Sequence, residues 1–266
     1  MLLQKEIVYN NKRLVYHTIG QGPCVVLLHG FAEDSRLWQN QYTALPGYQL
    51  LLPDLPGSGD SDMVEDMSME GLSKSVQAIL QQEHIDKCIL IGHSMGGYVA
   101  LAFASLFGEQ LLGLGLFHST AYADSDEKKA TRQKAIQFIE KKGVEVFLKN
   151  TTPNLFSPAT KEENPSLIEQ QLEDTAYFSK EALIAYYTAM IQRPDRSDIL
   201  QESKVPVLFI LGEYDTAVPM PDGLKQSHLP PVSYVRLFQH SGHMGMLEEP
   251  EKSNESLQAF LTMLSL

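Results

Sequence analysis

The sequence of 266 residues has few cysteines and no long apolar run. Its two cysteines, Cys24 and Cys88, each lie within a short apolar run, which excludes a disulfide framework and predicts two buried core thiols. No window holds eighteen consecutive apolar residues, so a membrane-spanning helix is excluded. Lys5 and Glu6 stand where a signal peptide would need an apolar stretch, and we therefore expect a cytoplasmic protein.

Metal-ligand patterns and positive charge are also scarce. His240 and His243 form the one close histidine pair, and neither a nearby cysteine nor an HExxH motif accompanies it, so we expect no metal and no cofactor. With 21 Lys+Arg against 33 Asp+Glu, the net charge is −12. This charge repels nucleic acid and anionic membrane surfaces, and we exclude both as partners. The sequence leaves the oligomeric state open.

What the chain does contain is an alternation of short apolar runs with helical stretches. This alternation is typical of an α/β protein with a mostly parallel sheet and helices on both faces. Eight strands and a closing helix are expected: a hairpin with strands 6–9 and 14–17, buried strands 25–28, 50–52, 89–91, 111–117 and 207–211, a last strand 233–238, and an amphipathic helix 253–264.

Residues 120–197 show no strand pattern and only helical stretches. Gly143 follows two lysines, as at a helix end, and Asn164 and Ser179 are typical of helix starts. We therefore expect a sheet domain formed by residues 1–119 and 198–266, interrupted after the sixth strand by a helical insertion of residues 120–197.

The segment Gly92-His93-Ser94-Met95-Gly96 lies between a predicted buried strand and an apolar helix. Side chains at positions 92 and 96 would collide in a sharp strand-to-helix turn, which explains the glycines. Such a turn projects the Ser94 hydroxyl outward at the carboxyl end of the sheet, in front of a helix N-terminus. The alternative is a plain glycine-rich turn without chemistry.

A serine hydroxyl becomes a strong nucleophile only when a base removes its proton, so a histidine and an orienting acid should follow. His243 is favoured because it lies in a glycine-flanked loop after the last strand, with His240 as the alternative. Asp215 is the favoured acid because it comes just past a buried strand, with Asp124 as the alternative.

The oxyanion of an acyl-transfer reaction needs two N–H donors. Met95 N–H follows the nucleophile directly, and Phe31 N–H lies in the loop after the strand 25–28, where Gly30 lets the backbone approach. For His29 a role in holding that loop by hydrogen bonds is favoured, and for Trp38 packing in the core. The insertion residues could equally dock the insertion on the sheet. The remaining candidates for a substrate pocket are His29, Trp38, His118, Tyr186, Tyr187 and Met190.

Five motifs together resemble the α/β-hydrolase superfamily over essentially the whole chain. They are HGF at 29–31, DLPGSGDS at 54–61, GHSMGG at 92–97, GEYD at 212–215 and SGH at 241–243. The resemblance implies an eight-stranded α/β-hydrolase fold, a Ser94–His243–Asp215 triad with Phe31 and Met95 as oxyanion donors, and a cap domain formed by the insertion. Within the superfamily, the chain resembles small bacterial serine carboxylesterases and enol-lactone hydrolases.

Single residues within these motifs separate the branches of the superfamily. Ser rather than Asp at position 94 argues against the haloalkane dehalogenase and epoxide hydrolase branches. Tyr98 departs from the Arg of the menaquinone-pathway lyase branch.

The function expected from these residues is hydrolysis of small carboxylic esters through an acyl-enzyme on Ser94. Hydrolysis of a lactone, a C–C bond or a thioester, cofactor-free haloperoxidase-like chemistry, and a non-catalytic or slow ligand-binding receptor remain alternatives. The loops expected around the site contain no Lys or Arg, with Arg36 and the lysines of the insertion as the local exceptions. We therefore expect uncharged, largely apolar esters as substrates.

Overall fold

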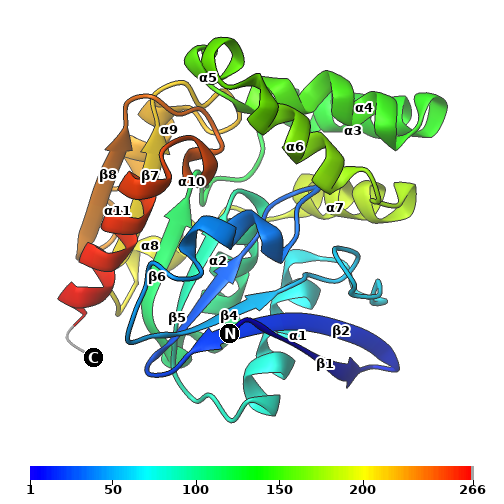
Figure 1. Cartoon of the computed structure of the whole chain (residues 1–266). Helices are drawn as coiled ribbons and strands as arrows, with labels where there is room; N and C mark the ends of the chain where they lie inside the picture. The colour runs from blue at the N-terminus through cyan, green and yellow to red at the C-terminus, as the bar shows by residue number, and fades with distance from the viewer. Residues whose placement is uncertain (265–266) are drawn as a thin grey trace.

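The computed structural model describes residues 1–264 and has an eight-stranded sheet with helices on both faces (Figure 1). The strands lie in the order β1-β2-β4-β3-β5-β6-β7-β8, antiparallel at β1/β2 and β2/β4 and parallel elsewhere. The predicted mostly parallel sheet is confirmed. Its strands are β1 (Leu3–Tyr9), β2 (Lys12–Gly20), β3 (Cys24–Leu28), β4 (Gln49–Pro53), β5 (Cys88–His93), β6 (Leu111–Phe117), β7 (Val207–Gly212) and β8 (Ser233–Phe238).

Alternate side chains of the central strands build two hydrophobic cores, one on each face of the sheet. Val26 and Leu90 pack with helices α1 and α2, whereas their neighbours Val25 and Ile89 pack with η1 and α11. Helix α11 begins at Pro250, three residues before the expected start, because a proline suits the first helical turn. Outside the insertion the helices are η1 (Ser35–Gln41), α1 (Met69–Gln82), α2 (Met95–Phe107), η2 (Gly108–Gln110), α8 (Ser197–Gln201), α9 (Met220–Gln226), α10 (Gly245–Glu248) and α11 (Pro250–Met263).

The two cysteines face each other in register on the neighbouring strands β3 and β5. Both are free and buried, as predicted for core thiols. Burial raises the pKa of the Cys88 thiol to about 12, so this thiol stays protonated at neutral pH.

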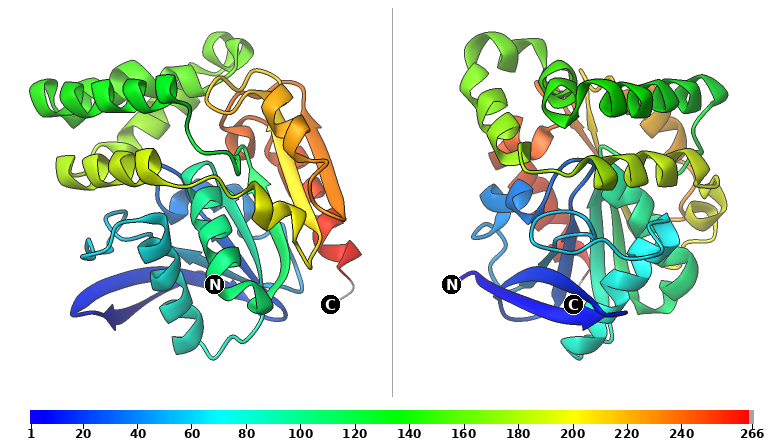
Figure 2. Two further views of the ribbon diagram at one scale, coloured as in Figure 1. Left: turned by 180° about the vertical axis from the view of Figure 1, so that it is seen from behind. Right: turned by 90° about the vertical axis from the view of Figure 1, so that its right-hand side faces the viewer.

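Between β6 and β7 the chain forms only helices and connecting turns. Figure 2 shows the long helices α3 and α7 side by side above the carboxyl ends of the strands. The two ends of this segment meet where Arg196 N–H donates to Ala121 C=O at 2.9 Å. Ser179 caps α7, as its sequence position predicts. The helices are α3 (Asp126–Lys142), α4 (Val144–Thr151), η3 (Thr152–Leu155), α5 (Pro158–Glu163), α6 (Pro165–Thr175) and α7 (Lys180–Gln192).

Candidate active site

Ser94 occupies the turn between β5 and α2 in a conformation that side chains rarely adopt, with φ 49° and ψ −115°. Three hydrogen bonds fix this backbone. Ser94 N–H donates to Phe117 C=O at 3.0 Å, and Ser94 C=O accepts from the Ser119 hydroxyl at 2.7 Å and from Gly97 N–H at 2.9 Å. The strained turn is therefore held by the neighbouring strand β6 and by the first turn of α2.

The glycines on either side of Ser94 are required by space. A Cβ on Gly92 would lie 2.2 Å from the backbone of Gly96, and a Cβ on Gly96 would lie 2.5 Å from His29 C=O. Neither backbone can move without displacing a central strand or the helix behind the serine. The Gly-x-Ser-x-Gly spacing therefore follows from the close packing of β3, β5 and α2.

His243 and Asp215 form a buried pair on the loops after β8 and β7. His243 Nδ1 lies 2.8 Å from Asp215 Oδ2, while Asp215 Oδ1 accepts from the backbone N–H groups of Ala217 and Val218, both at 2.8 Å. Burial opposes the charge on Asp215, but His243 and His118 outweigh it and hold the pKa of this carboxyl well below its usual range. Asp215 is therefore an ionised acceptor for the imidazole N–H.

His118 lies behind this pair, not in the pocket where it was expected. Its Nε2 accepts from Gly245 N–H at 3.3 Å, so its proton is on Nδ1, which lies 3.3 Å from Asp215 Oδ2. Complete burial lowers the pKa of His118 to about 4, and the ring is neutral at pH 7. His118 therefore supports Asp215 from the core side.

The alternative base and acid lie elsewhere. His240 is exposed, and its backbone N–H donates to Glu249. Asp124 is buried beside two guanidinium groups, with Arg132 Nε at 2.6 Å and an Arg193 nitrogen at 2.9 Å. Burial opposes its charge, but these arginines hold the pKa of Asp124 below its usual range. Asp124 thus braces the insertion and does not contact His243.

Ser94 and His243 line a cavity of about 690 Å³ between the sheet and the insertion. Of the predicted pocket residues, Tyr187 and Met190 line it, and so does Phe31, which was predicted as an oxyanion donor. The Phe31 and Tyr187 rings lie with centroids 4.3 Å apart, so the loop after β3 and helix α7 form one aromatic wall.

The other predicted pocket residues are packed away from this cavity, and their expected role is corrected. His29 Nε2 accepts from Leu55 N–H at 2.9 Å, which joins the loops after β3 and β4. Trp38 is fully buried against Phe117. Tyr186 is also fully buried, and its hydroxyl donates to Pro56 C=O at 2.6 Å, so it docks α7 on the sheet domain.

The charge of the cavity differs from the sequence-based expectation. Arg132 and Lys128, one turn apart on α3, both line it. The expectation considered the loops at the strand ends and the lysines of the insertion, and it missed Arg132. The spacing of four residues between two cations on one helix face was the available signal.

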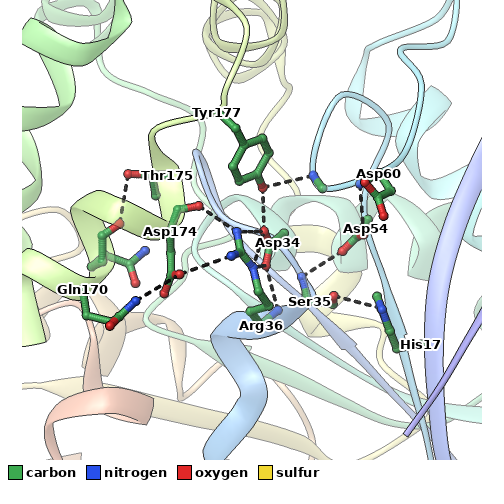
Figure 3. Close-up of polar contacts among 12 residues, drawn as sticks. His17, Asp34, Ser35, Arg36, Asp54, Asp60, Gln170, Asp174, Thr175 and Tyr177 are labelled. Carbon is green, nitrogen blue, oxygen red and sulfur yellow. Dashed lines mark hydrogen bonds and ion pairs between the residues drawn. The ribbon is translucent and has the colours of Figure 1, made fainter.

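Arg36, which the sequence offered as a local cation, lies away from this cavity. It pairs with Asp34 at 2.6 Å and with Asp174 at 3.2 Å (Figure 3). In the same cluster the Tyr177 hydroxyl donates to Asp34 at 2.6 Å and accepts from Gly59 N–H at 3.1 Å. These contacts join η1 and the loop after β4 to the α6–α7 connection of the insertion.

The described part of the chain, residues 1–264, was also compared with the requirements of a metal site and of a membrane span. It holds no group of three or more His, Cys, Asp or Glu side chains placed to bind a metal ion. None of its helices combines the length and the apolar character needed to cross a membrane.

The strand order and the strained serine turn define the class of α/β-hydrolase folds. A model of the alpha/beta hydrolase family matches residues 25–255, and the chain belongs to this family. Hydrolase activity is supported by this membership and by the esterase among its structural neighbours.

Individual relatives differ in their reactions. The chain is 30% identical to a dihydrolipoyllysine-residue acetyltransferase component of the acetoin cleaving system of Pseudomonas putida, over 90% of this chain and 64% of that protein. It is 25% identical to a 2-hydroxy-6-oxo-6-phenylhexa-2,4-dienoate hydrolase of Burkholderia cepacia, over 95% and 92%. A solved, malate-bound thermophilic esterase of Thermogutta terrifontis is 27% identical, with a TM-score of 0.92 over 98% and 99%.

Proposed function

We propose that this protein is a serine hydrolase of small carboxylic esters. Ser94 is the nucleophile, His243 the general base and Asp215 the acid that orients it. The observation that carries the proposal is that Ser94 and His243 line one cavity while Asp215 holds His243 Nδ1 at 2.8 Å. A cytoplasmic location remains a prediction from the sequence.

The proposed mechanism follows from the hydrogen bonds of His243. Because the ionised Asp215 accepts the proton on Nδ1, the lone pair on Nε2 is free to take the hydroxyl proton of Ser94. The serine oxygen then attacks the ester carbonyl, and the amides of Phe31 and Met95 donate to the oxyanion. Protonated His243 releases the alcohol, and water activated by the same ring frees the acid from the acyl-enzyme.

We further propose that residues 120–197 form a cap domain on the core of residues 1–119 and 198–266. The support is that α3 and α7 supply walls of the cavity, among them Tyr187 and Met190. His243 N–H also donates to Leu155 C=O at 2.7 Å, so the insertion directly holds the loop of the base. The cap therefore sets substrate choice in this proposal.

The arginines of the cap modify the expected substrate. Asp124 is shared by Arg132 and Arg193, and Arg132 and Lys128 line the cavity together with the carboxylates of Glu127 and Asp222. We infer that the cavity takes a small ester with an apolar body and accepts a carboxylate near Arg132. The Thermogutta terrifontis esterase, solved with the dicarboxylate malate bound, supports this inference.

The same charge favours a second candidate, hydrolysis of a lactone or C–C bond in a carboxylate-bearing substrate. The Burkholderia cepacia relative is named as the hydrolase of such a dienoate. A panel of esters, lactones, thioesters and vinylogous keto acids, each in neutral and carboxylate-bearing form, separates the two candidates by kcat/KM.

A fluorophosphonate probe with peptide mass spectrometry tests the shared mechanism. We expect one adduct, on Ser94, and loss of turnover on labelling. Folded protein without this adduct contradicts both candidates and favours the receptor alternative.

A further inference from the structure

A buried ion pair beside the candidate site has no part in the proposed steps. Glu33 lies in the loop after β3, and His93 is the last residue of β5, directly before Ser94. Glu33 Oε2 lies 2.8 Å from His93 Nδ1, and the two side chains are 4% and 0% exposed. Burying two charges costs desolvation free energy unless further hydrogen bonds satisfy both groups. The other contacts of Glu33 and His93 therefore decide whether the pair is stable.

The second ring nitrogen of His93 contacts the loop of the candidate base. His93 Nε2 lies 2.9 Å from His243 C=O. A carbonyl oxygen can only accept, so Nε2 carries a proton, and the carboxylate of Glu33 on the other side also takes a proton from Nδ1. Burial disfavours both charges, but their mutual attraction outweighs it, raising the pKa of His93 and lowering that of Glu33. His93 is thus an imidazolium between two acceptors.

Glu33 also closes the loop that carries the predicted oxyanion donor. Gly30 N–H donates to Glu33 Oε2 at 2.6 Å, and Phe31 follows directly in the chain. The packing here is tight, because a Cβ on Gly30 would lie 2.7 Å from Glu33 Oε2 and 2.9 Å from His93 Nδ1. One carboxylate oxygen therefore fixes the position of Phe31 N–H relative to the strand that carries Ser94.

We propose that Glu33 and His93 are positioning residues that join the oxyanion loop, the nucleophile turn and the base loop into one rigid unit. The proposal rests on the function proposed above. The two residues act through the backbone of Gly30 and His243 and through the chain connection to Ser94. Their loss should therefore lower kcat, which depends on this alignment, much more than it changes KM.

The charge of the pair gives a second, independent readout. The His93 and His243 rings have centroids 4.8 Å apart, and Glu33 contacts the opposite side of the His93 ring. The charged ring of His93 therefore stands next to the ring of the candidate base, and neutralising the pair removes this neighbouring charge. A substitution of Glu33 leaves the other titratable groups around His243 in place. These groups are Asp215, His118 and, on the cavity wall, Glu127, Lys128, Arg132 and Asp222.

Two substitutions separate geometry from charge. Glu33→Gln has the size of Glu33, and its amide oxygen can still accept from Gly30 N–H. The same oxygen cannot donate to His93 Nδ1, so the substitution removes both charges and weakens the link to His93. We expect kcat to fall about 10- to 100-fold, KM to stay within about twofold, and the acidic limb of kcat/KM to move to higher pH. Glu33→Asp keeps the charge but shortens the side chain, so kcat should fall without movement of the limb.

The control is Glu140→Gln, which removes the same charge from an exposed position on α3 and should change neither kcat nor the limb. Phosphonate titration of active sites corrects each kcat for misfolded protein. An unchanged kcat and an unchanged limb in Glu33→Gln, with wild type labelled on Ser94, overturn this inference alone. Wild type that turns over no substrate and gains no Ser94 adduct overturns the proposed function instead.

Discussion

The sheet domain and the helical insertion hold their functional residues in different ways. Strands β3, β5 and β7 are buried along their whole length, and Ser94 and Asp215 follow directly from two of them. The insertion packs apolar side chains such as Leu183 and Met190 into the same hydrophobic cluster as α2. It adds polar contacts to the sheet domain, such as Tyr177 with Asp34. The strands thus set the positions of Ser94 and Asp215, whereas the insertion supplies walls of the cavity above them.

The two regions also differ in charge. Residues 120–197 contain 11 basic and 12 acidic residues, and the remaining residues contain 10 and 21, so the net charges are −1 and −11. The cations that line the cavity, Lys128 and Arg132, both come from the insertion. Reactivity is therefore expected to depend on the sheet domain, and substrate preference on the insertion.

The largest expected effect is on the sheet side. Ser94→Ala and His243→Ala should each lower kcat at least about a thousandfold while the fold survives, because each removes a partner in the same proton transfer. Asp215→Asn should be nearly as severe. Steady-state kinetics on an activated ester and circular dichroism check both statements.

The double variant Ser94→Ala/His243→Ala tests whether the two residues act as one unit. It should be little worse than either single variant. Losses that multiply would mean that one of the two residues is misassigned.

The next effect concerns the ion pairs within the insertion. Asp124→Asn removes the carboxylate shared by Arg132 and Arg193 and leaves two buried cations, so we expect a loss of about 3–5 kcal/mol in the free energy of unfolding. Thermal unfolding should show a Tm lower by roughly 6 °C or more. Glu145→Gln, which breaks the exposed pair with Lys149, should cost at most about 0.5 kcal/mol. Equal losses in both variants would contradict a structural role for Asp124.

A smaller effect is expected on the preference for charged substrates. Arg132→Gln should lower kcat/KM for a carboxylate-bearing hemiester at least about tenfold, because it removes a charge-assisted hydrogen-bond donor from the cavity wall. The isosteric neutral ester should change less than about twofold. Lys149→Gln removes the same charge from an exposed site on α4 and should affect neither substrate. Equal losses for both esters in Arg132→Gln would show that this arginine supports the fold alone.

The smallest effect distinguishes residues of α7 that line the cavity from one that packs on the sheet domain. Shortening Tyr187 and Met190 to Ala should shift the preferred acyl-chain length severalfold in kcat/KM, because both side chains line the cavity. Tyr186→Phe should leave that preference unchanged and lower stability by about 1 kcal/mol, since its hydroxyl bonds the loop after β4. A p-nitrophenyl ester series and thermal unfolding measure the two effects. A shift in chain preference in Tyr186→Phe would contradict this division.

The sheet could be predicted from sequence because its signals are local. Each central strand is a short apolar run ended by turn residues, and the turn at Ser94 has its own spacing of glycines. A position after the end of a strand was not sufficient to predict which residues line the cavity. Trp38 and His118 both follow strands, yet both side chains are packed in the core.

The residues that sequence reasoning missed depend on long-range packing. The spacing of Lys128 and Arg132 places both on one face of α3, but Arg132 reaches the cavity only because α3 lies above the strand ends. In the sequence, nothing distinguishes Glu33 from an ordinary acidic residue in a loop. Its partner His93, at 2.8 Å, comes from β5, which lies far away along the chain. The tertiary fold therefore supplies the partners that give these two side chains their environment.

The hydrogen bond between Arg196 N–H and Ala121 C=O has a consequence for protein engineering. It closes the insertion at its base, so the chain leaves and re-enters the sheet at neighbouring points. The entropy of closing such a loop grows only slowly with its length, so helices of another number or size can be placed between these two points with little cost in closure. New helices must still replace the apolar side chains that the insertion packs into the core. A library of grafted helical segments that keep these apolar contacts would present many entrances to one unchanged sheet.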